Sequence, residues 1–311
     1  MGLGANRVSG RAGRRDASAA RSTADTLERC LVHLALRDPR RRRSYPAVIR
    51  EVVVHSLGDL IAQTTPSEPD PTHGRRRSTG VYRGAPDATW PLLTSLDKLG
   101  GTKPPHTKAD LEEYILRNFI RYSRPYFGSP PVNDWEVLVA AQHHGLPTRL
   151  LDWTYSPLVA AHFATVDPAS TADRAVWRLD WKVVHRRFQL PDLALLIQDL
   201  EGMFGSERRF TPSALFGMKP DPPPFACMLE PPSLDVRIVA QSAAFTLCSD
   251  KRQSFDRFLE QHGLGDALTK IVIPAAERGR IRDQLDLVSV DERRLFPDLD
   301  GVAAHLKRYY S

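Results

Sequence analysis

The sequence has few cysteines and no long apolar run. Its cysteines, Cys30, Cys227 and Cys248, are odd in number, lie far apart and lack the spacing of a metal site. The longest uncharged stretch near an apolar centre runs from Trp153 to Val166, which is shorter than the ~18–20 apolar residues of a membrane span. The chain also lacks an Asn-x-Ser/Thr glycosylation site and the apolar segment of a secretory signal. These absences predict a reducing, cytoplasmic setting and no membrane segment.

Most general catalytic motifs are absent as well. The chain contains no Walker loop, no Gly-x-Gly-x-x-Gly loop, no Gly-x-Ser-x-Gly elbow and no His-Glu-x-x-His pair. A metal site would have to combine His143, His144, His162 and Asp152, but adjacent histidines on a helix point about 100° apart. We therefore expect no metal, and we expect His143 or His144 to be a buried hydrogen-bonding group or a substrate contact.

The excess positive charge lies near the N-terminus. The chain has 43 Lys and Arg against 37 Asp and Glu, which gives a formal net charge of +6. Residues 1–50 hold 12 basic and 4 acidic residues, which leaves 31 and 33 in the rest of the chain. A basic groove on the folded part is therefore not indicated. Residues 1–45 are predicted to be a disordered basic arm, either a nucleic-acid contact or an extension without that role.

The rest of the chain alternates predicted strands and helices, which is typical of an α+β fold. Runs of β-branched and apolar residues predict strands at 47–54, 80–84, 175–179, 236–240, 244–248 and 270–273. Apolar residues at helical spacing, several following a capping Ser, Thr or Asn, predict helices at 56–62, 107–119, 133–144, 157–165, 193–204, 254–262, 275–285 and 302–309. Two proline-containing stretches are predicted to be loops, 64–79 and 220–232.

One polar segment, residues 142–154, joins two apolar predicted helices. Its Arg149 and Asp152 would have to pair with each other or with a ligand if they are buried. One interpretation is a buried polar hinge that fixes how the two helices cross. The other is a loop that projects Trp153, Thr154 and a charge pair into a ligand cleft.

Several of these segments are similar to a known family. The tripeptide Tyr82-Arg83-Gly84, the segment 142–154 and the helix at 156–164 resemble the FRG domain family, which is named for an aromatic-Arg-Gly tripeptide near its start. Residues 237–246 resemble the second half of that family, with Ala243 in place of a usual glycine.

The resemblance extends over roughly residues 48–309 and implies one FRG domain with a C-terminal extension over residues 46–311. FRG proteins are bacterial and occur among candidate toxins and phage-defence proteins. The resemblance therefore implies a function of that type and a cognate antitoxin or immunity partner.

The same segments are similar to mono-ADP-ribosyltransferases. Tyr82-Arg83-Gly84 is similar to the aromatic-Arg-Gly step on their first strand, and residues 152–164 are similar to their next strand and the helix after it. Phe245-Thr246-Leu247 looks like the strand that follows their catalytic Glu. This resemblance implies a split or mixed β-sheet flanked by helices, with NAD or another phosphorylated nucleotide as the ligand.

The resemblance also implies roles for individual residues. Arg83 would hold the NAD phosphates with two parallel hydrogen bonds, and Gly84 would let the ligand approach the backbone. The Thr154 hydroxyl would hold the nicotinamide ribose, and an aromatic ring would stack on nicotinamide. The predicted ligand-binding residues are Tyr82, Arg83, Gly84, Gln142, His143, Arg149, Asp152, Trp153 and Thr154.

The catalytic carboxylate is where the similarity to transferases ends. The chain has no Glu-x-Glu pair, and Val236 and Arg237 occupy the positions where a Glu is expected. Asp235 and Glu230 are the nearest carboxylates, and Gln241 is a further candidate that cannot act as a base. We therefore expect Arg83, Thr154 and Gln241 to act with one of these two carboxylates.

Three functions stay open on this basis. One is NAD-dependent transfer of ADP-ribose or hydrolysis of NAD. Another is a nucleotide-binding or protein-interaction module of the same fold without turnover. The last is an RNA-directed toxin with different chemistry. Protein side chains, nucleic-acid bases and water all remain candidate acceptors.

Overall fold

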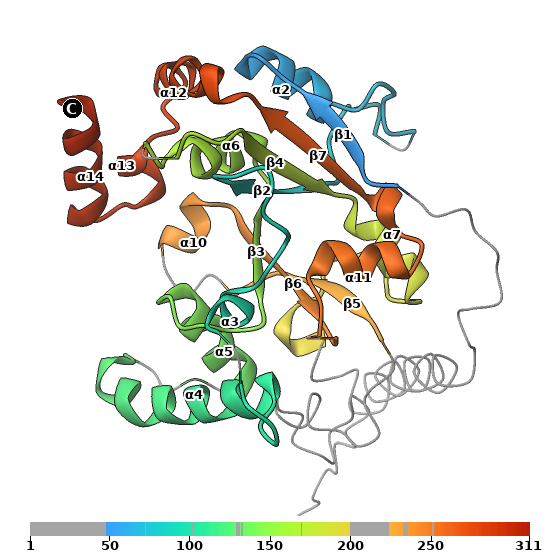
Figure 1. The fold of residues 1–311 in the computed structure, drawn as a ribbon, viewed down its shortest axis with the longest axis vertical. Coiled ribbons are helices and arrows are strands. Elements are labelled where there is room, and N and C mark those ends of the chain that lie inside the picture. The colour runs from blue at the N-terminus through green and yellow to red at the C-terminus, as the bar shows by residue number, and fades with distance from the viewer. Residues whose placement is uncertain are drawn as a thin grey trace, which may run out of the picture.

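The computed structural model describes residues 48–311, except for 72, 101, 129, 130, 132, 169, 200–223, 233–235 and 251. The predicted arm, residues 1–45, lies outside the described residues. The described part is an α+β fold with one mixed sheet flanked by helices (Figure 1).

The sheet has seven strands in the order β1-β7-β4-β2-β3-β6-β5 among the described residues. The pair β1–β7 is parallel, and every other neighbouring pair is antiparallel. Strands β2 and β3 therefore lie inside the sheet, with β4 and β6 on their outer sides. The strands are β1 (Arg50–Val53), β2 (Val81–Ala85), β3 (Leu151–Thr154), β4 (Arg174–Leu179), β5 (Ala226–Leu229), β6 (Ala243–Cys248) and β7 (Leu268–Ile273).

Many helices begin where the sequence places a capping side chain. Ser56, Thr107, Asn133 and Ser156 each accept a hydrogen bond from a backbone N–H of the first turn, as predicted. The α-helices are α2 (Leu57–Thr64), α3 (Ser95–Lys98), α4 (Lys108–Ser123), α5 (Asp134–His143), α6 (Pro157–Thr165), α7 (Trp181–Arg187), α10 (Val236–Ala240), α11 (Phe255–Gln261), α12 (Arg278–Leu287), α13 (Glu292–Leu295) and α14 (Leu299–Tyr309). Among the described residues, no helix has the length and apolar character needed to span a membrane.

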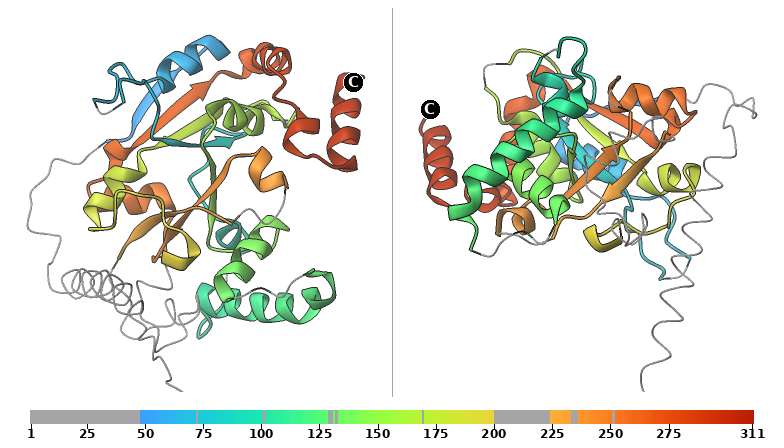
Figure 2. Two further views of the ribbon diagram at one scale, coloured as in Figure 1. Left: turned by 180° about the vertical axis from the view of Figure 1, so that it is seen from behind. Right: turned by 90° about the horizontal axis from the view of Figure 1, so that it is seen from below.

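Two faces of the sheet are covered by different helices. Helices α2, α6 and α12 pack on one face, where Tyr82, Val176 and Ile271 join their buried residues. Helices α7 and α11 pack on the other face, around Trp153 and Trp177. The two views in Figure 2 show the same arrangement, with the C-terminal helices α13 and α14 beyond α12.

Helix α6 lies unusually close to strand β2 at Gly84. A Cβ atom at this position would be 2.1 Å from the Ala160 carbonyl oxygen and 2.5 Å from the Ala164 nitrogen. The glycine therefore admits the helix backbone, whereas the sequence analysis assigned its small size to ligand access. This close contact sets the position of α6 over the centre of the sheet.

The predicted strand at 236–240 is wrong, because these residues form helix α10. The Gln241 N–H donates to the Arg237 carbonyl 3.0 Å away, and Val236 and Val239 are exposed to solvent. Val236, Ile238 and Val239 favour a strand by composition, but none of the described strands pairs with residues 236–240. Ser242, with φ of 47°, then turns the chain into β6.

The loop predicted at 220–232 contains strand β5. Prolines flank the strand at Pro224 and Pro231, but none interrupts its four buried residues. The predicted helix at 193–204 is wrong at its start, because Leu195 forms a bridge to Leu229 and the helical residues begin at 197. Residues 200–204 lie outside the described part.

A charged cluster attaches the C-terminal helices to the rest of the fold. Arg308 on α14 donates to both oxygens of Asp286 at 2.8 Å and to Glu292 on α13 at 2.9 Å. Glu292 also accepts from Arg282 at 2.8 Å, and Arg282 donates to Nδ1 of His162 at 2.9 Å. This chain of contacts connects α14 through α13 and α12 to α6.

Replacing Gly84 by alanine tests the close approach of α6. The new methyl group would overlap the α6 backbone, so Gly84→Ala should lower the free energy of unfolding by about 3 kcal/mol or more. The matched control is Gly279→Ala at an exposed position of α12, where the methyl group meets nothing within 4 Å. That control should be neutral or stabilising by roughly 0.5–1 kcal/mol. Urea unfolding of both variants measures this, and equal effects would contradict the packing role.

The buried His162 gives the stability a specific pH dependence. Burial, with the nearby Arg282 guanidinium, lowers the pKa of His162 to about 4. The unfolded chain therefore takes up a proton below about pH 6.5 that the folded protein does not, so stability should fall by up to about 3 kcal/mol between pH 6.5 and 4. His162→Gln should flatten this part of the curve, while the exposed His106→Gln should not. An unchanged slope in His162→Gln would show that other groups cause the acid sensitivity.

Candidate functional site

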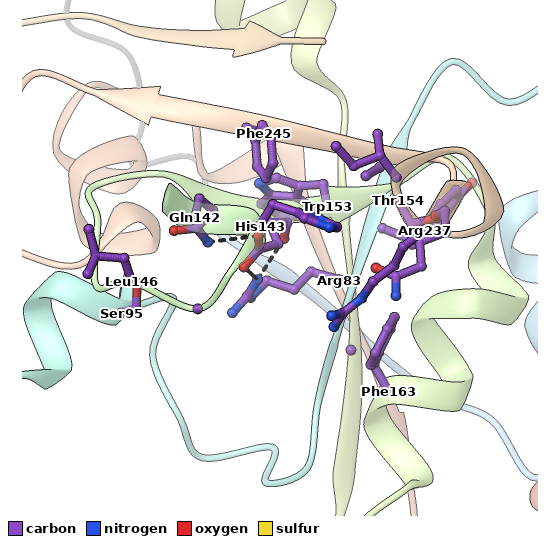
Figure 3. A pocket seen from close by; sticks show the side chains of 17 residues that line it. Arg83, Ser95, Gln142, His143, Leu146, Trp153, Thr154, Phe163, Arg237 and Phe245 are labelled. Carbon is purple, nitrogen blue, oxygen red and sulfur yellow. Dashed lines mark hydrogen bonds and ion pairs between the residues drawn. The ribbon is translucent and has the colours of Figure 1, made fainter. Parts of the chain in front are cut away.

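A cavity of about 450 Å³ opens between the centre of the sheet and helices α5, α6 and α10. Strands β2, β3 and β6 supply its floor, and α10 supplies one wall (Figure 3). Its volume lies within the roughly 300–1,000 Å³ of sites for small molecules. It is lined by Tyr82, Arg83, Gly84, Ser95, Gln142, His143, Gly145, Leu146, Asp152, Trp153, Thr154, Phe163, Arg237, Ile238, Gln241, Ala243 and Phe245.

A hydrogen-bonded group fixes Arg83 and Asp152 within the cavity. Arg83 Nη1 donates to the Asp152 carbonyl oxygen at 2.7 Å and lies 3.4 Å from Asp152 Oδ2. Gln142 Nε2 donates to the other carboxylate oxygen, Oδ1, at 2.8 Å, and Gln142 Oε1 accepts from Thr148. Strand β2 thus presents a cation, and β3 a carboxylate held from two sides.

A second cation reaches the cavity from α10. The Arg237 guanidinium lies 4.5 Å from the ring centroid of Phe296. Arg237 lines the cavity, and Phe296 does not. Figure 3 shows the end of the Arg237 side chain directed towards Phe163. Arg83 and Arg237 give the cavity two guanidinium groups, which favours an anionic ligand such as a phosphate ester.

Aromatic and hydroxyl groups complete the lining. The buried Trp153 indole donates to Thr246 Oγ1 at 2.9 Å, which fixes the ring. Thr154 Oγ1 donates to the Gln241 carbonyl oxygen at 2.7 Å and accepts from the Ser156 N–H at 3.1 Å. The Thr154 hydroxyl therefore ties β3 to the end of α10, and only its remaining acceptor capacity serves a ligand.

The carboxylates are placed differently from the prediction. Among the described residues that line the cavity, Asp152 alone carries a carboxylate. Glu230 accepts from the Tyr155 hydroxyl and does not line the cavity, and Asp235 lies outside the described residues. Gln241 does line it, but its Nε2 donates to the Leu295 carbonyl oxygen at 3.0 Å.

Residues 78–173 match the family model of the FRG domain. This chain contains an FRG domain. The matched region supplies Arg83, Gln142 and Asp152 to the cavity, whereas Arg237 and Gln241 come from residues beyond it. No curated protein matches the chain, and no solved structure matches it.

Arg149 of the FRG domain does not take part in the cavity. Its side chain is buried and pairs with Glu112 on α4, which also accepts from the Arg149 N–H at 2.7 Å. The expectation that a buried Arg149 pairs with Asp152 or with a ligand is therefore wrong, because Arg149 pairs with Glu112 and Asp152 lies next to Arg83. The partner of Arg149 lies 37 residues earlier in the chain, and no local pattern in the sequence indicates it.

Tyr82 is also more structural than expected. It lines the cavity, but its hydroxyl lies 2.6 Å from Ser78 Oγ and donates to the Thr64 carbonyl oxygen, on the side of α2. The ring is fully buried, so it cannot stack on a ligand without rearrangement. Trp153, at the same level of the sheet, has its indole N–H already occupied.

Several cavity residues were not among the predicted ligand-binding residues, although all of them except Ser95 lie in segments that resemble the FRG family. Arg237 is the most important, and it begins the segment 237–246 that resembles the family and stands where a carboxylate was expected. Among the described residues, no group of three His, Cys, Asp or Glu side chains is placed to hold a metal ion. The remaining unpredicted lining residues are Ser95, Gly145, Leu146, Phe163, Ile238, Ala243 and Phe245.

Substitutions of Glu112 and Asp152 should distinguish a residue that stabilises the fold from one that serves the cavity. Glu112→Gln leaves the Arg149 guanidinium buried without its countercharge, so it should lower the free energy of unfolding by about 3–5 kcal/mol. Asp152→Asn alters a side chain that is 55% exposed, and its cost should stay below about 1 kcal/mol. Chemical denaturation of the two variants gives both values. A larger loss for Asp152→Asn would mean that Asp152 serves stability first.

Proposed function

We propose that the cavity binds NAD and that the protein cleaves its bond between nicotinamide and ribose. The ADP-ribosyl group is then transferred to an acceptor or to water. The observation that carries the proposal is the presence of two arginines, Arg83 and Arg237, in one cavity with the partly exposed ring of Phe163. Two guanidinium groups suit a pyrophosphate, and aromatic side chains suit a heteroaromatic ring.

The arrangement of the strands supports this proposal. The three segments that resemble mono-ADP-ribosyltransferases lie on β2, on β3 with α6, and on β6. These strands are consecutive neighbours in the sheet, with Tyr82 opposite Thr154 and Asp152 opposite Phe245. Segments that are about 70 to 160 residues apart in the chain therefore contribute to one cavity, as a shared binding site requires.

The proposed chemistry assigns a role to Asp152. When the glycosidic bond breaks, nicotinamide leaves with the bonding electron pair and the ribose carbon becomes positively charged. A carboxylate beside that carbon stabilises the charge and accepts the proton of the attacking water or acceptor group. Asp152 takes the place that the sequence analysis gave to Asp235 or Glu230. Gln142 donates to one oxygen of this carboxylate at 2.8 Å and Arg83 lies 3.4 Å from the other, so both orient it.

A second candidate function is nucleotide binding without turnover. Arg237 and Gln241 occupy the corner of the cavity that precedes β6, where the transferase comparison places a catalytic Glu. Neither side chain acts as a base, and the Gln241 amide is already bonded to Leu295. In this alternative the FRG domain binds the nucleotide as a signal or presents a surface to another protein.

The setting is proposed from the resemblance alone. We propose a bacterial cytoplasmic protein of the toxin or phage-defence type, with an antitoxin or immunity partner and with residues 1–45 as a contact for nucleic acid. The acceptor is a protein side chain, a nucleic-acid base or water. Release of nicotinamide is common to all three, so it is the first quantity to measure.

Incubation with NAD tests the activity directly. Purified protein should release nicotinamide from NAD, alone or with cell lysate, and Asp152→Asn should reduce the rate by at least about tenfold while the fold is retained. Chromatography of the products measures this. If no nicotinamide appears but NAD still raises the melting temperature, the binding function replaces the enzymatic one.

Substitution of Arg83 tests the phosphate contact. Arg83→Lys keeps the charge but loses the planar pair of N–H donors, so Arg83→Lys and Arg83→Ala should both lose most of the ligand-induced shift in melting temperature. Arg257→Lys on the exposed surface of α11 is the control and should keep the shift. NAD and ADP-ribose are the titrants. Undiminished shifts in both Arg83 variants would remove Arg83 from the site.

A further inference from the structure

Helix α14 is attached to the rest of the protein by a stripe of small and polar residues. Gly301, His305 and Arg308 form this docked stripe, and Gly301 packs so closely that a Cβ atom there would be 1.9 Å from the Phe296 carbonyl oxygen. His305 Nδ1 lies 3.6 Å from a carboxylate oxygen of Glu292, and Arg308 donates to the same carboxylate at 2.9 Å. The side of α14 that faces the fold therefore contains no large apolar side chain.

The apolar side of α14 is turned to solvent instead. Leu299 is 85% exposed and Tyr310 is 81% exposed. Because each residue turns a helix by about 100°, these side chains lie on the far side of α14 from the docked stripe. A surface helix normally buries its apolar side against the core, so α14 is oriented the opposite way. The exposed apolar residues of this side are Leu299, Val302, Ala303, Leu306, Tyr309 and Tyr310.

The exposed side of α14 has the pattern of a helix that pairs with another helix. Alternating intervals of four and three residues are those of a pairing seam, with charged residues beside it that select the partner. One flank of the seam carries Asp300 and Lys307, which are exposed and seven residues apart. The other flank carries Val302 and Tyr309, also seven residues apart. The seam itself consists of Leu299, Ala303, Leu306 and Tyr310.

The charges beside the seam complement a second copy of the same helix in antiparallel orientation. A two-fold axis across the helices sets each flank against the same flank of the other copy and reverses its direction. Asp300 of each copy then lies beside Lys307 of the other, and the apolar flanks meet each other. In a parallel pair the charged flank would face the apolar flank instead. The antiparallel arrangement also brings the positive end of each helix dipole next to the negative end of the other.

We propose that α14 is a dimerisation helix, which pairs antiparallel with α14 of a second copy of this chain. Figures 1 and 2 show α14 at the periphery of the fold, where another copy can reach it. A membrane surface suits this helix less well, because helices that lie on membranes carry many Lys and Arg residues on the polar side. The fully exposed charges of α14 are one acid, Asp300, and one base, Lys307. No residue of α14 lines the cavity, so the proposal is independent of the ligand.

Sedimentation velocity of the whole chain tests the proposal. The protein should be monomeric at about 1 μM and increasingly dimeric towards about 300 μM, because one helix pair buries less than the ~800 Å² per partner of a standard interface. Leu306→Glu places a charge in the seam and should raise the dissociation constant of the dimer at least about tenfold. Leu287→Glu, at an exposed leucine that ends α12, is the matched control and should stay within about twofold. A monomer at every concentration, or an unchanged dimer in Leu306→Glu, would overturn the proposal.

Reversal of the charges tests the orientation of the pair. Asp300→Lys and Lys307→Asp each set like charges against each other and should weaken self-association about three- to tenfold. An equimolar mixture of the two variants should recover the affinity, because two lysines then face two aspartates. If the mixture does not recover it, antiparallel pairing is wrong. Sedimentation of the monomeric protein with anionic lipid vesicles would overturn the proposal in favour of a membrane surface. Melting curves of each variant confirm that the fold is retained.

Discussion

The contact between Gly84 and helix α6 is the constraint on which the site depends. Strand β2 carries Arg83, and α6 carries Phe163, so their separation determines how wide the cavity is on this side. The helix backbone meets the strand where any side chain would collide. Because β3 runs directly into α6 through Ser156, the same contact also fixes Asp152 and Thr154.

The elements with strong local signals were predictable from the sequence. Helix α6 begins and ends where Ser156, Pro157 and the apolar pattern place it, since a cap and a first-turn proline determine a helix start locally. Helix α10 and strand β5 were not predictable in this way. Val236 and Val239 favour a strand by composition, but the structure places both in helix α10. Strand β5 forms by pairing with β6, and the prolines on either side of it led to the prediction of a loop.

Some residues of the candidate site were predictable from the sequence and others were not. The resemblance located Arg83, Gln142, Asp152 and Trp153, and the structure brings all four to one cavity. The resemblance could not show that Arg149 lies outside the cavity, because side chains only a few residues apart in one motif point in different directions. The buried arginine faces α4, and the carboxylate three residues later faces the cavity. Arg237 lies in a segment that resembles the family, but the resemblance gave it no role in ligand binding.

The location of β2 and β3 within the sheet has a consequence for dissection of the molecule. The family match at residues 78–173 ends just before β4, and it contains neither β6 nor β7. A fragment cut at those limits would expose the hydrogen-bonding edges of both β2 and β3 and the apolar faces that α11 and α12 cover. Such edges pair readily with other chains. The recognisable segment is thus the interior of a larger folding unit, and isolated it should aggregate instead of forming a small module.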